Sequence, residues 1–173
     1  MLGSLDWTPA SDRPDLLAAP VAAAVRDVPD AYVAPIDPAL ADTAEFCAHY
    51  DVPLEASANC VIVAAKRGGE VRYAACMVRA TDRADINGVV RRHLGARKAS
   101  FAPMDEATSL TGMEYGGITP FGLPEGWPVL VDEAAAVLPQ AVVGSGVRGS
   151  KLLVPGKALA ALPGAEVIAL AQA

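Results

Sequence analysis

The chain has 173 residues and a formal net charge of −6, from 14 basic and 20 acidic residues. This length suits one domain, and 53% hydrophobic residues against 20% charged ones exclude a wholly disordered chain. The longest uncharged apolar run covers residues 16–25, about half of what a membrane-spanning helix needs. Three cysteines without dense spacing fit a reducing compartment. We therefore expect a soluble, cytoplasmic protein without membrane contacts.

Hydrophobic periodicity and turn residues predict many short elements. In chain order these are a helix over 14–27 weakened by Pro20, a strand over 31–36, a helix over 39–50 after Asp37, strands over 59–65 and 71–80, a helix over 86–94, a strand over 98–102 and a helix over 103–110. After a glycine- and proline-rich loop over 113–126 come a strand over 128–131, a helical turn over 133–138, strands over 140–143 and 151–154, a helix over 155–162 and a strand over 165–170. This irregular mixture predicts a single α/β domain of the mixed α+β type, with a mixed, mostly antiparallel sheet surrounded by short helices.

Charge is unevenly distributed along the chain. Residues 1–55 carry a net charge of −8, residues 66–98 carry +6, and residues 99–173 carry −4. The acidic balance argues against general nucleic-acid binding and against DNA as a partner. The basic segment is either a solvated helix face with arginines near a helix C-terminus or a surface that contacts phosphates.

Several common catalytic and binding patterns are missing from the sequence. The two histidines, His49 and His93, belong to no HExxH pattern, and no CxxC pair occurs. We therefore expect neither a metal site nor a cofactor. Residues 144–149 match G-x-G-x-x-G, but an extended segment follows where a dinucleotide site requires a helix. This loop is expected to connect two strands and to line a pocket.

The least ordinary segment is the loop from Gly112 to Pro124, which holds Gly-Gly-Ile-Thr-Pro-Phe-Gly at 116–122. Its glycines and prolines specify a fixed, non-repetitive backbone, and successive N–H groups of a Gly-Gly pair can point at one acceptor. The loop resembles the G-G-[IV]-[ST]-P-[FI]-G loop of the YbaK/EbsC-type aminoacyl-tRNA deacylase family, the prolyl-tRNA-synthetase-associated editing domain. The similarity continues in 84–87, 94–98, 104–107, 131–132 and 146–149, and covers about residues 30–170. It implies a deacylase-like domain over 31–173, preceded by an acidic, helical extension over 1–30.

The resemblance also implies an activity and a partner. Members of this family hydrolyse the ester of mischarged aminoacyl-tRNA with the substrate's own hydroxyl, the glycine-loop backbone and a bound water, without a metal. The implied partner is aminoacyl-tRNA, bound through its 3′ end and acceptor stem. By this resemblance the catalytic residues are Gly116, Gly117, Ile118, Thr119 and Asn59. The substrate-binding residues are Pro120, Gly122, Gly144, Ser145, Gly146, Arg148 and Lys66. The tRNA-binding residues are Arg91, Arg92, Arg97 and Lys98.

The chain departs from the family pattern at two positions. Many members carry a lysine where this chain has Asn59. Lys66 follows seven residues later, over about 20 Å away along an extended strand, and is therefore a poor substitute. The family often has a serine at the position of Gly144. These departures keep two rivals open beside the editing enzyme: a tRNA-, nucleotide- or protein-binding module that has lost catalysis, and a small-molecule hydrolase on the same scaffold.

Overall fold

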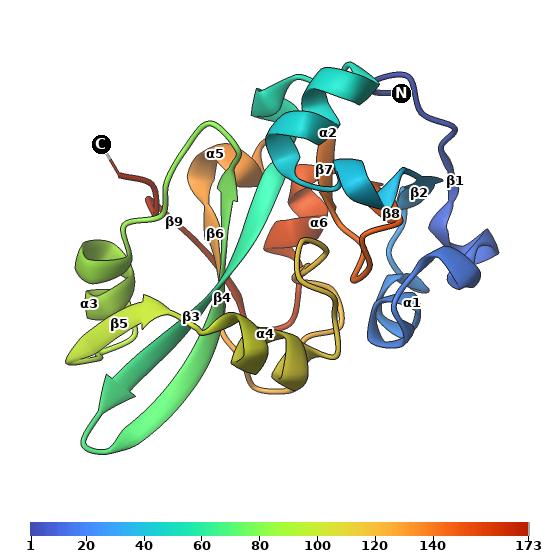
Figure 1. The fold of residues 1–173 in the computed structure, drawn as a ribbon. Coiled ribbons are helices and arrows are strands. Elements are labelled where there is room, and N and C mark those ends of the chain that lie inside the picture. Colours follow the sequence, from blue (N-terminus) through green and yellow to red (C-terminus); the bar gives the residue numbers. More distant parts are fainter. Residues whose placement is uncertain (173) are drawn as a thin grey trace.

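The computed structural model describes residues 1–172 and divides their strands between two sheets (Figure 1). The four-stranded sheet is antiparallel throughout, in the order β1 (Thr8–Pro9), β2 (Tyr32–Pro35), β8 (Ser150–Val154) and β7 (Ala141–Gly144). The five-stranded sheet has the order β5 (Lys98–Phe101), β3 (Ala58–Arg67), β4 (Glu70–Arg79), β6 (Val129–Asp132) and β9 (Ala165–Ile168). Its β5–β3 and β3–β4 pairs are antiparallel, whereas β4–β6 and β6–β9 are parallel. The predicted mixed α+β class is confirmed; the division into two sheets was not anticipated.

Short helices surround the sheets. They are η1 (Ala10–Asp12), η2 (Pro14–Leu16), α1 (Ala19–Val25), η3 (Pro38–Leu40), α2 (Thr43–Tyr50), η4 (Leu54–Ala56), η5 (Ile86–Val90), α3 (Arg91–His93), α4 (Met104–Thr111), α5 (Glu133–Ala136) and α6 (Gly156–Ala160). Within residues 1–172, no helix is both long enough and apolar enough to cross a membrane.

The β3–β4 hairpin lies within the larger sheet, between β5 and β6, and its sequence explains why it forms. Gly68 and Gly69 both have positive φ, as a tight two-residue hairpin turn requires. Ile62 packs into one hydrophobic cluster and the next residue, Val63, into another. The apolar run is therefore buried on both faces, as its continuous pattern indicates.

The predicted helix over 39–50 is wrong in one respect that shapes the site. Asp37 caps only the 3₁₀ turn η3, where its Oδ1 accepts from the N–H of Ala39 at 3.0 Å. The backbone then extends at Asp42 (ψ 138°), and α2 begins at Thr43. This break places Asp42 and Thr43 at the edge of a cavity.

The N-terminal segment packs into the body of the domain. The predicted helix over 14–27 divides into η2 and α1, and Pro20 stands in the first turn of α1, where proline is tolerated. Val21 and Val25 are buried in the main core cluster. The N–H of Ala18 donates to the carbonyl of Ser145 at 3.2 Å, which ties the segment to the loop between β7 and β8.

Candidate active site

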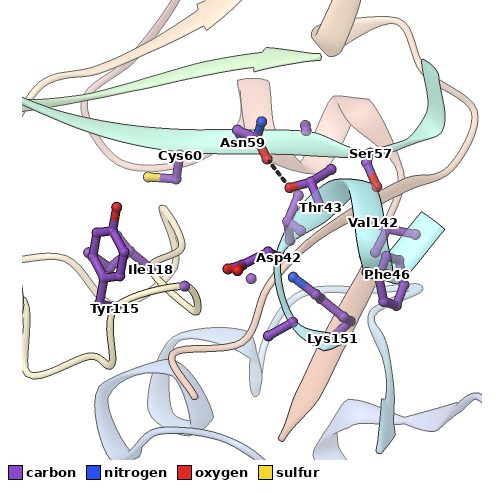
Figure 2. Close-up of a pocket in the computed structure, with 15 residues that line it drawn as sticks. Asp42, Thr43, Phe46, Ser57, Asn59, Cys60, Tyr115, Ile118, Val142 and Lys151 are labelled. Carbon is purple, nitrogen blue, oxygen red and sulfur yellow. Dashed lines mark hydrogen bonds between the residues drawn. The ribbon is translucent and has the colours of Figure 1, made fainter. Parts of the chain in front are cut away.

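A cavity of about 240 Å³ opens where the two sheets meet (Figure 2). A parallel bridge between Ser57 and Val142 joins the start of β3 to β7 at this point. The lining residues come from the start of α2, the start of β3, the glycine loop, β7 and β8; they are Ala41, Asp42, Thr43, Phe46, Ser57, Ala58, Asn59, Cys60, Tyr115, Gly116, Ile118, Val142, Val143, Gly144 and Lys151. Segments far apart in the sequence therefore contribute to one cavity.

Two glycine-rich loops form one wall and are locked together by backbone contacts. The N–H of Gly146 donates to the carbonyl of Gly117 at 2.7 Å, and the N–H of Glu114 donates to the carbonyl of Gly146 at 2.8 Å. A Cβ on Gly117 would lie 2.7 Å from the backbone of Val147. The glycine is required here because no side chain fits between the loops.

The glycine loop leaves two backbone donors without a backbone acceptor in the part of the chain that the structure describes. The N–H of Gly117 is occupied, because it donates to the carbonyl of Glu114 at 2.9 Å. Among residues 1–172, the N–H groups of Gly116 and Ile118 have no backbone acceptor, and both residues line the cavity. The backbone N–H groups on either side of Gly117 are therefore unpaired, within the described residues, in the wall of the cavity.

Asn59 stands at the edge of the cavity and is paired with a hydroxyl. Thr43 Oγ1 donates to Asn59 Oδ1 at 2.9 Å, and Figure 2 shows the two groups facing each other. This bond joins the start of α2 to the start of β3. Asn59 is therefore a neutral group held in place beside the cavity.

A lysine that the sequence analysis had not singled out supplies the positive charge of the cavity. Lys151 lies on β8 and is only 8% exposed. Its Nζ lies 5.2 Å from the centroid of the Phe46 ring, a cation–π contact. Burial is the main cause that lowers the pKa of Lys151 below its ordinary value. The signal that could have found it is an isolated lysine two residues after a glycine-rich loop and directly before the apolar run Leu152–Val154.

Asp42 and Tyr115 line the mouth of the cavity, and Arg148 holds both. Arg148 Nη1 lies 3.4 Å from Asp42 Oδ1 and donates to the carbonyl of Tyr115 at 3.3 Å. Its Nε also donates to the carbonyl of Pro38 at 3.2 Å. Arg148 therefore clamps the extended turn before α2 to the glycine loop, while the Asp42 carboxylate stays 64% exposed.

The cysteine in the cavity is not an activated nucleophile. Burial raises the pKa of the Cys60 thiol above its ordinary value, so the neutral thiol dominates at neutral pH. Among residues 1–172, no group of three or more His, Cys, Asp or Glu side chains is arranged to hold a metal ion.

The structure brings some of the predicted site residues to the cavity and places others elsewhere. Those that line it are Asn59, Gly116, Ile118 and Gly144. Gly117, Gly146 and Arg148 support its wall through the contacts above. Ser145 is fully buried, and its hydroxyl lies within hydrogen-bond distance of the carbonyl oxygens of Val147 and Ser150, to either of which it can donate its single proton. Thr119 is fully buried too, and its Oγ1 has no hydrogen-bond partner within residues 1–172.

Pro120 and Gly122 line a second cavity of about 1080 Å³, formed mostly by apolar residues of the segment 24–29, of the loop before β6 and of α6. The Gly122 backbone packs closely on Pro20. Neither residue lines the cavity that contains Lys151.

Lys66 lies at the far end of β3, outside the cavity, and directly faces Lys98 on β5. The predicted tRNA-binding residues Arg91, Arg92 and Arg97 follow nearby in α3 and the turn before β5. None of these five residues makes a salt bridge with another residue of the described chain. Because these five residues have no salt-bridge partner among residues 1–172, they form a basic cluster whose positive charge is not neutralised. Within it, the like charges of Lys66 and Lys98 repel each other across the paired strands.

Comparisons with known proteins agree with this fold. The chain resembles the crystal structure of a protein proposed to be a trans-editing enzyme for prolyl-tRNA synthetase, with a TM-score of 0.77, 22% identity, and coverage of 90% of this chain and 97% of that one. It also resembles the hypothetical protein APE2540, with a TM-score of 0.68, 22% identity, and coverage of 80% and 86%. A signal-transduction candidate from Marinobacter aquaeolei VT8 gives a TM-score of 0.58 at 19% identity, covering 90% of this chain and 31% of that chain. No curated protein matches the sequence.

A family model decides the assignment. The model of the aminoacyl-tRNA editing domain matches residues 37–162, which include both glycine loops, Asn59 and Lys151. The resemblance seen in the sequence is thereby confirmed. The chain belongs to the aminoacyl-tRNA editing domain family.

Proposed function

We propose that this protein is a trans-acting deacylase that hydrolyses the ester bond of mischarged aminoacyl-tRNA in the cavity between the two sheets. The observation that carries the proposal is the glycine-loop wall, where the N–H groups of Gly116 and Ile118 have no backbone acceptor among the described residues and both residues line one cavity with the buried Lys151. Donors placed where negative charge develops are a large source of rate enhancement in acyl transfer. The family assignment supplies the substrate class.

The size of the cavity favours the aminoacyl end of the tRNA as its occupant. Its volume of about 240 Å³ is below the roughly 300–1000 Å³ typical of sites for larger ligands. The amino acid and the ester enter, and the nucleotides remain outside. Tyr115, 56% exposed at the mouth, offers a face on which the terminal base can stack.

The reaction needs a water, a polarised carbonyl and a leaving ribose oxygen. Water adds to the ester carbonyl carbon, the bond from that carbon to the ribose oxygen breaks, and a proton from the water ends on the ribose oxygen. The products are the free amino acid and a tRNA with a free 3′-terminal hydroxyl. The N–H groups of Gly116 and Ile118 stabilise the carbonyl oxygen, with a hydroxyl of the substrate assisting the proton transfer.

Outside the cavity, the basic cluster of Lys66, Arg91, Arg92, Arg97 and Lys98 is proposed to contact the acceptor stem. Such contacts are sequence-independent and position the RNA. This proposal gives Lys66 a role on the tRNA surface in place of the cavity.

The second candidate is a binding module that holds tRNA, a nucleotide or a protein without turnover. Asn59, in the place of the family lysine, is the feature that favours it. The test is deacylation of tRNAs charged with Ala, Ser, Pro, Cys and Thr by the wild type. Turnover of at least one species, with correctly paired tRNA spared, supports the editing enzyme. Tight tRNA binding without turnover of any species would replace it by the binding module.

A further inference from the structure

Lys151 is a largely buried charge that makes no salt bridge within residues 1–172. Its Nζ contacts the face of the Phe46 ring, and the Asp42 carboxylate, which lines the same cavity, acts on it only through space. Buried charges are normally paired within the fold, whereas no carboxylate of residues 1–172 lies within 4.0 Å of Lys151 Nζ. The side of Lys151 that the fold leaves open faces the cavity.

The surroundings of Lys151 specify what the open side can bind. Figure 2 shows Ile118 and Lys151 on different sides of the cavity. The unpaired N–H of Ile118 and the ammonium of Lys151 are both donors, so a group that binds to both must accept two hydrogen bonds. A carbonyl oxygen that becomes negative during ester hydrolysis meets this requirement.

The depth of Lys151 in the cavity favours the ester of the substrate, and not a phosphate, as the group that contacts it. Lys151 is 8% exposed, and the cavity is too small for a nucleotide beside the amino acid. The substrate chain enters with its aminoacyl end first, so the ester reaches Lys151 while the phosphates stay outside.

We propose that the Lys151 ammonium contacts the carbonyl oxygen of the scissile ester and stabilises the negative charge that forms on it as water adds. The ammonium keeps its proton throughout. An electron pair on this oxygen re-forms the carbonyl double bond when the bond to the ribose oxygen breaks, and the ribose oxygen takes up the proton that the attacking water releases. This inference rests on the proposed deacylase function and adds a catalytic residue from β8 that lies outside the glycine motifs.

The test compares Lys151→Met and Lys151→Gln with the wild type on the mischarged tRNA that the wild type hydrolyses. Both variants lose the charge and keep a side chain of similar length. We expect kcat to fall by about 100-fold or more, with KM within about threefold, because the contact strengthens only in the transition state. Circular dichroism and thermal denaturation establish that the variants fold. Lys157→Met is the matched control, since Lys157 is exposed on α6 and does not line the cavity that contains Lys151.

A charge-relocation variant separates a catalytic role from a structural one. Asn59 lines the same cavity from β3, so Asn59→Lys in the Lys151→Met background returns an ammonium from the other sheet. We expect kcat to rise by about tenfold over Lys151→Met alone, which repair of packing at position 151 would not produce.

Three results would count against the proposal. Unchanged kcat in folded Lys151→Met and Lys151→Gln, with an active wild type, would overturn the role of Lys151 alone. A rise in KM with unchanged kcat would move the contact to a phosphate and overturn the ester assignment. A wild type that hydrolyses no mischarged tRNA would overturn the deacylase function, and the Lys151 role with it.

Discussion

The N–H of Gly146 donates to the carbonyl oxygen of Gly117 at 2.7 Å, and this bond joins two loops that are distant in the sequence. Because Gly117 also has no room for a side chain against Val147, the wall of the cavity is a close-packed pair of backbones. Rigid placement of donors is what electrostatic stabilisation of an oxyanion requires.

The first prediction concerns this close packing. Gly117→Ala places a Cβ 2.7 Å from the Val147 backbone, so the loops must separate. We expect the free energy of unfolding to fall by about 1–3 kcal/mol and kcat/KM to fall with it, measured by urea denaturation and deacylation. Gly149→Ala is the control, since its Cβ would meet only a Pro38 carbon at 3.9 Å. Equal effects of both substitutions would refute this account of the wall.

The second prediction concerns the buried hydroxyl of Thr119. Its Oγ1 has no partner among residues 1–172 and lies outside the cavity lining. Thr119→Val removes an unpaired polar group and keeps the shape. We expect stability to be unchanged or increased by up to about 1–3 kcal/mol, and kcat to stay within about threefold of the wild type. A large loss of kcat in a stable variant would instead place the hydroxyl on the substrate.

The third prediction concerns recognition of the substrate's α-ammonium. The Asp42 carboxylate lines the cavity and is exposed, so we expect it to accept from that group. N-acetylation of the aminoacyl group should lower kcat/KM of the wild type by about tenfold, and Asp42→Asn should abolish most of that discrimination. Glu45→Gln, on the exposed side of α2, is the control. If the wild type hydrolyses both esters equally, Asp42 does not bind the amine.

The fourth prediction concerns the basic cluster. Arg97→Gln combined with Lys98→Gln removes two exposed charges that form no salt bridge within the described chain. We expect weaker tRNA binding and a slope of log affinity against log salt that is shallower by about 1–2, measured by titration at several KCl concentrations. Arg13→Gln, whose charge already pairs with Asp15 at 2.9 Å, should leave the slope unchanged. An unaltered slope in the double variant would exclude phosphate contacts at these positions.

The fifth prediction concerns the pH dependence of stability. Burial holds the pKa of Lys151 below its ordinary value of 10.5, so between the folded and unfolded values the unfolded chain binds more protons and stability rises with pH. Below the pKa of Lys151 in the folded protein, the lysine is charged in both states, and the folded state bears the whole free-energy cost of burying that charge. Lys151→Met should therefore be stabilised most, relative to the wild type, near neutral pH, and the difference should shrink towards pH 10.5. A difference that does not vary with pH would show that burial does not perturb Lys151.

Comparing Lys151→Met with the wild type is necessary because buried thiols also change the pH dependence of stability in this range. Burial raises the pKa of the Cys76 thiol to about 12 and also raises that of Cys60. Raised thiol pKa values reduce stability as pH rises above their ordinary value of 9.0. Both proteins contain these thiols, so their contribution cancels in the difference.

The sequence by itself determined the hairpin and the fold class, because these depend on short-range patterns. The apolar run from Asn59, the Gly68–Gly69 turn and the returning strand specify β3 and β4 without knowledge of the rest. The glycine-rich loop at 116–122 was equally distinctive, and the family model confirms the family that this loop indicated.

Only the tertiary structure decided which side chains share the cavity. Every residue of β8 is buried, so no alternation in the sequence shows where Lys151 points. The direction of Lys151 follows from the position of β8 between β2 and β7. Asp42 reaches the cavity because the chain breaks between η3 and α2. Local patterns determine elements, whereas the meeting of two sheets determines which residues face one another, and that depends on packing across the whole chain.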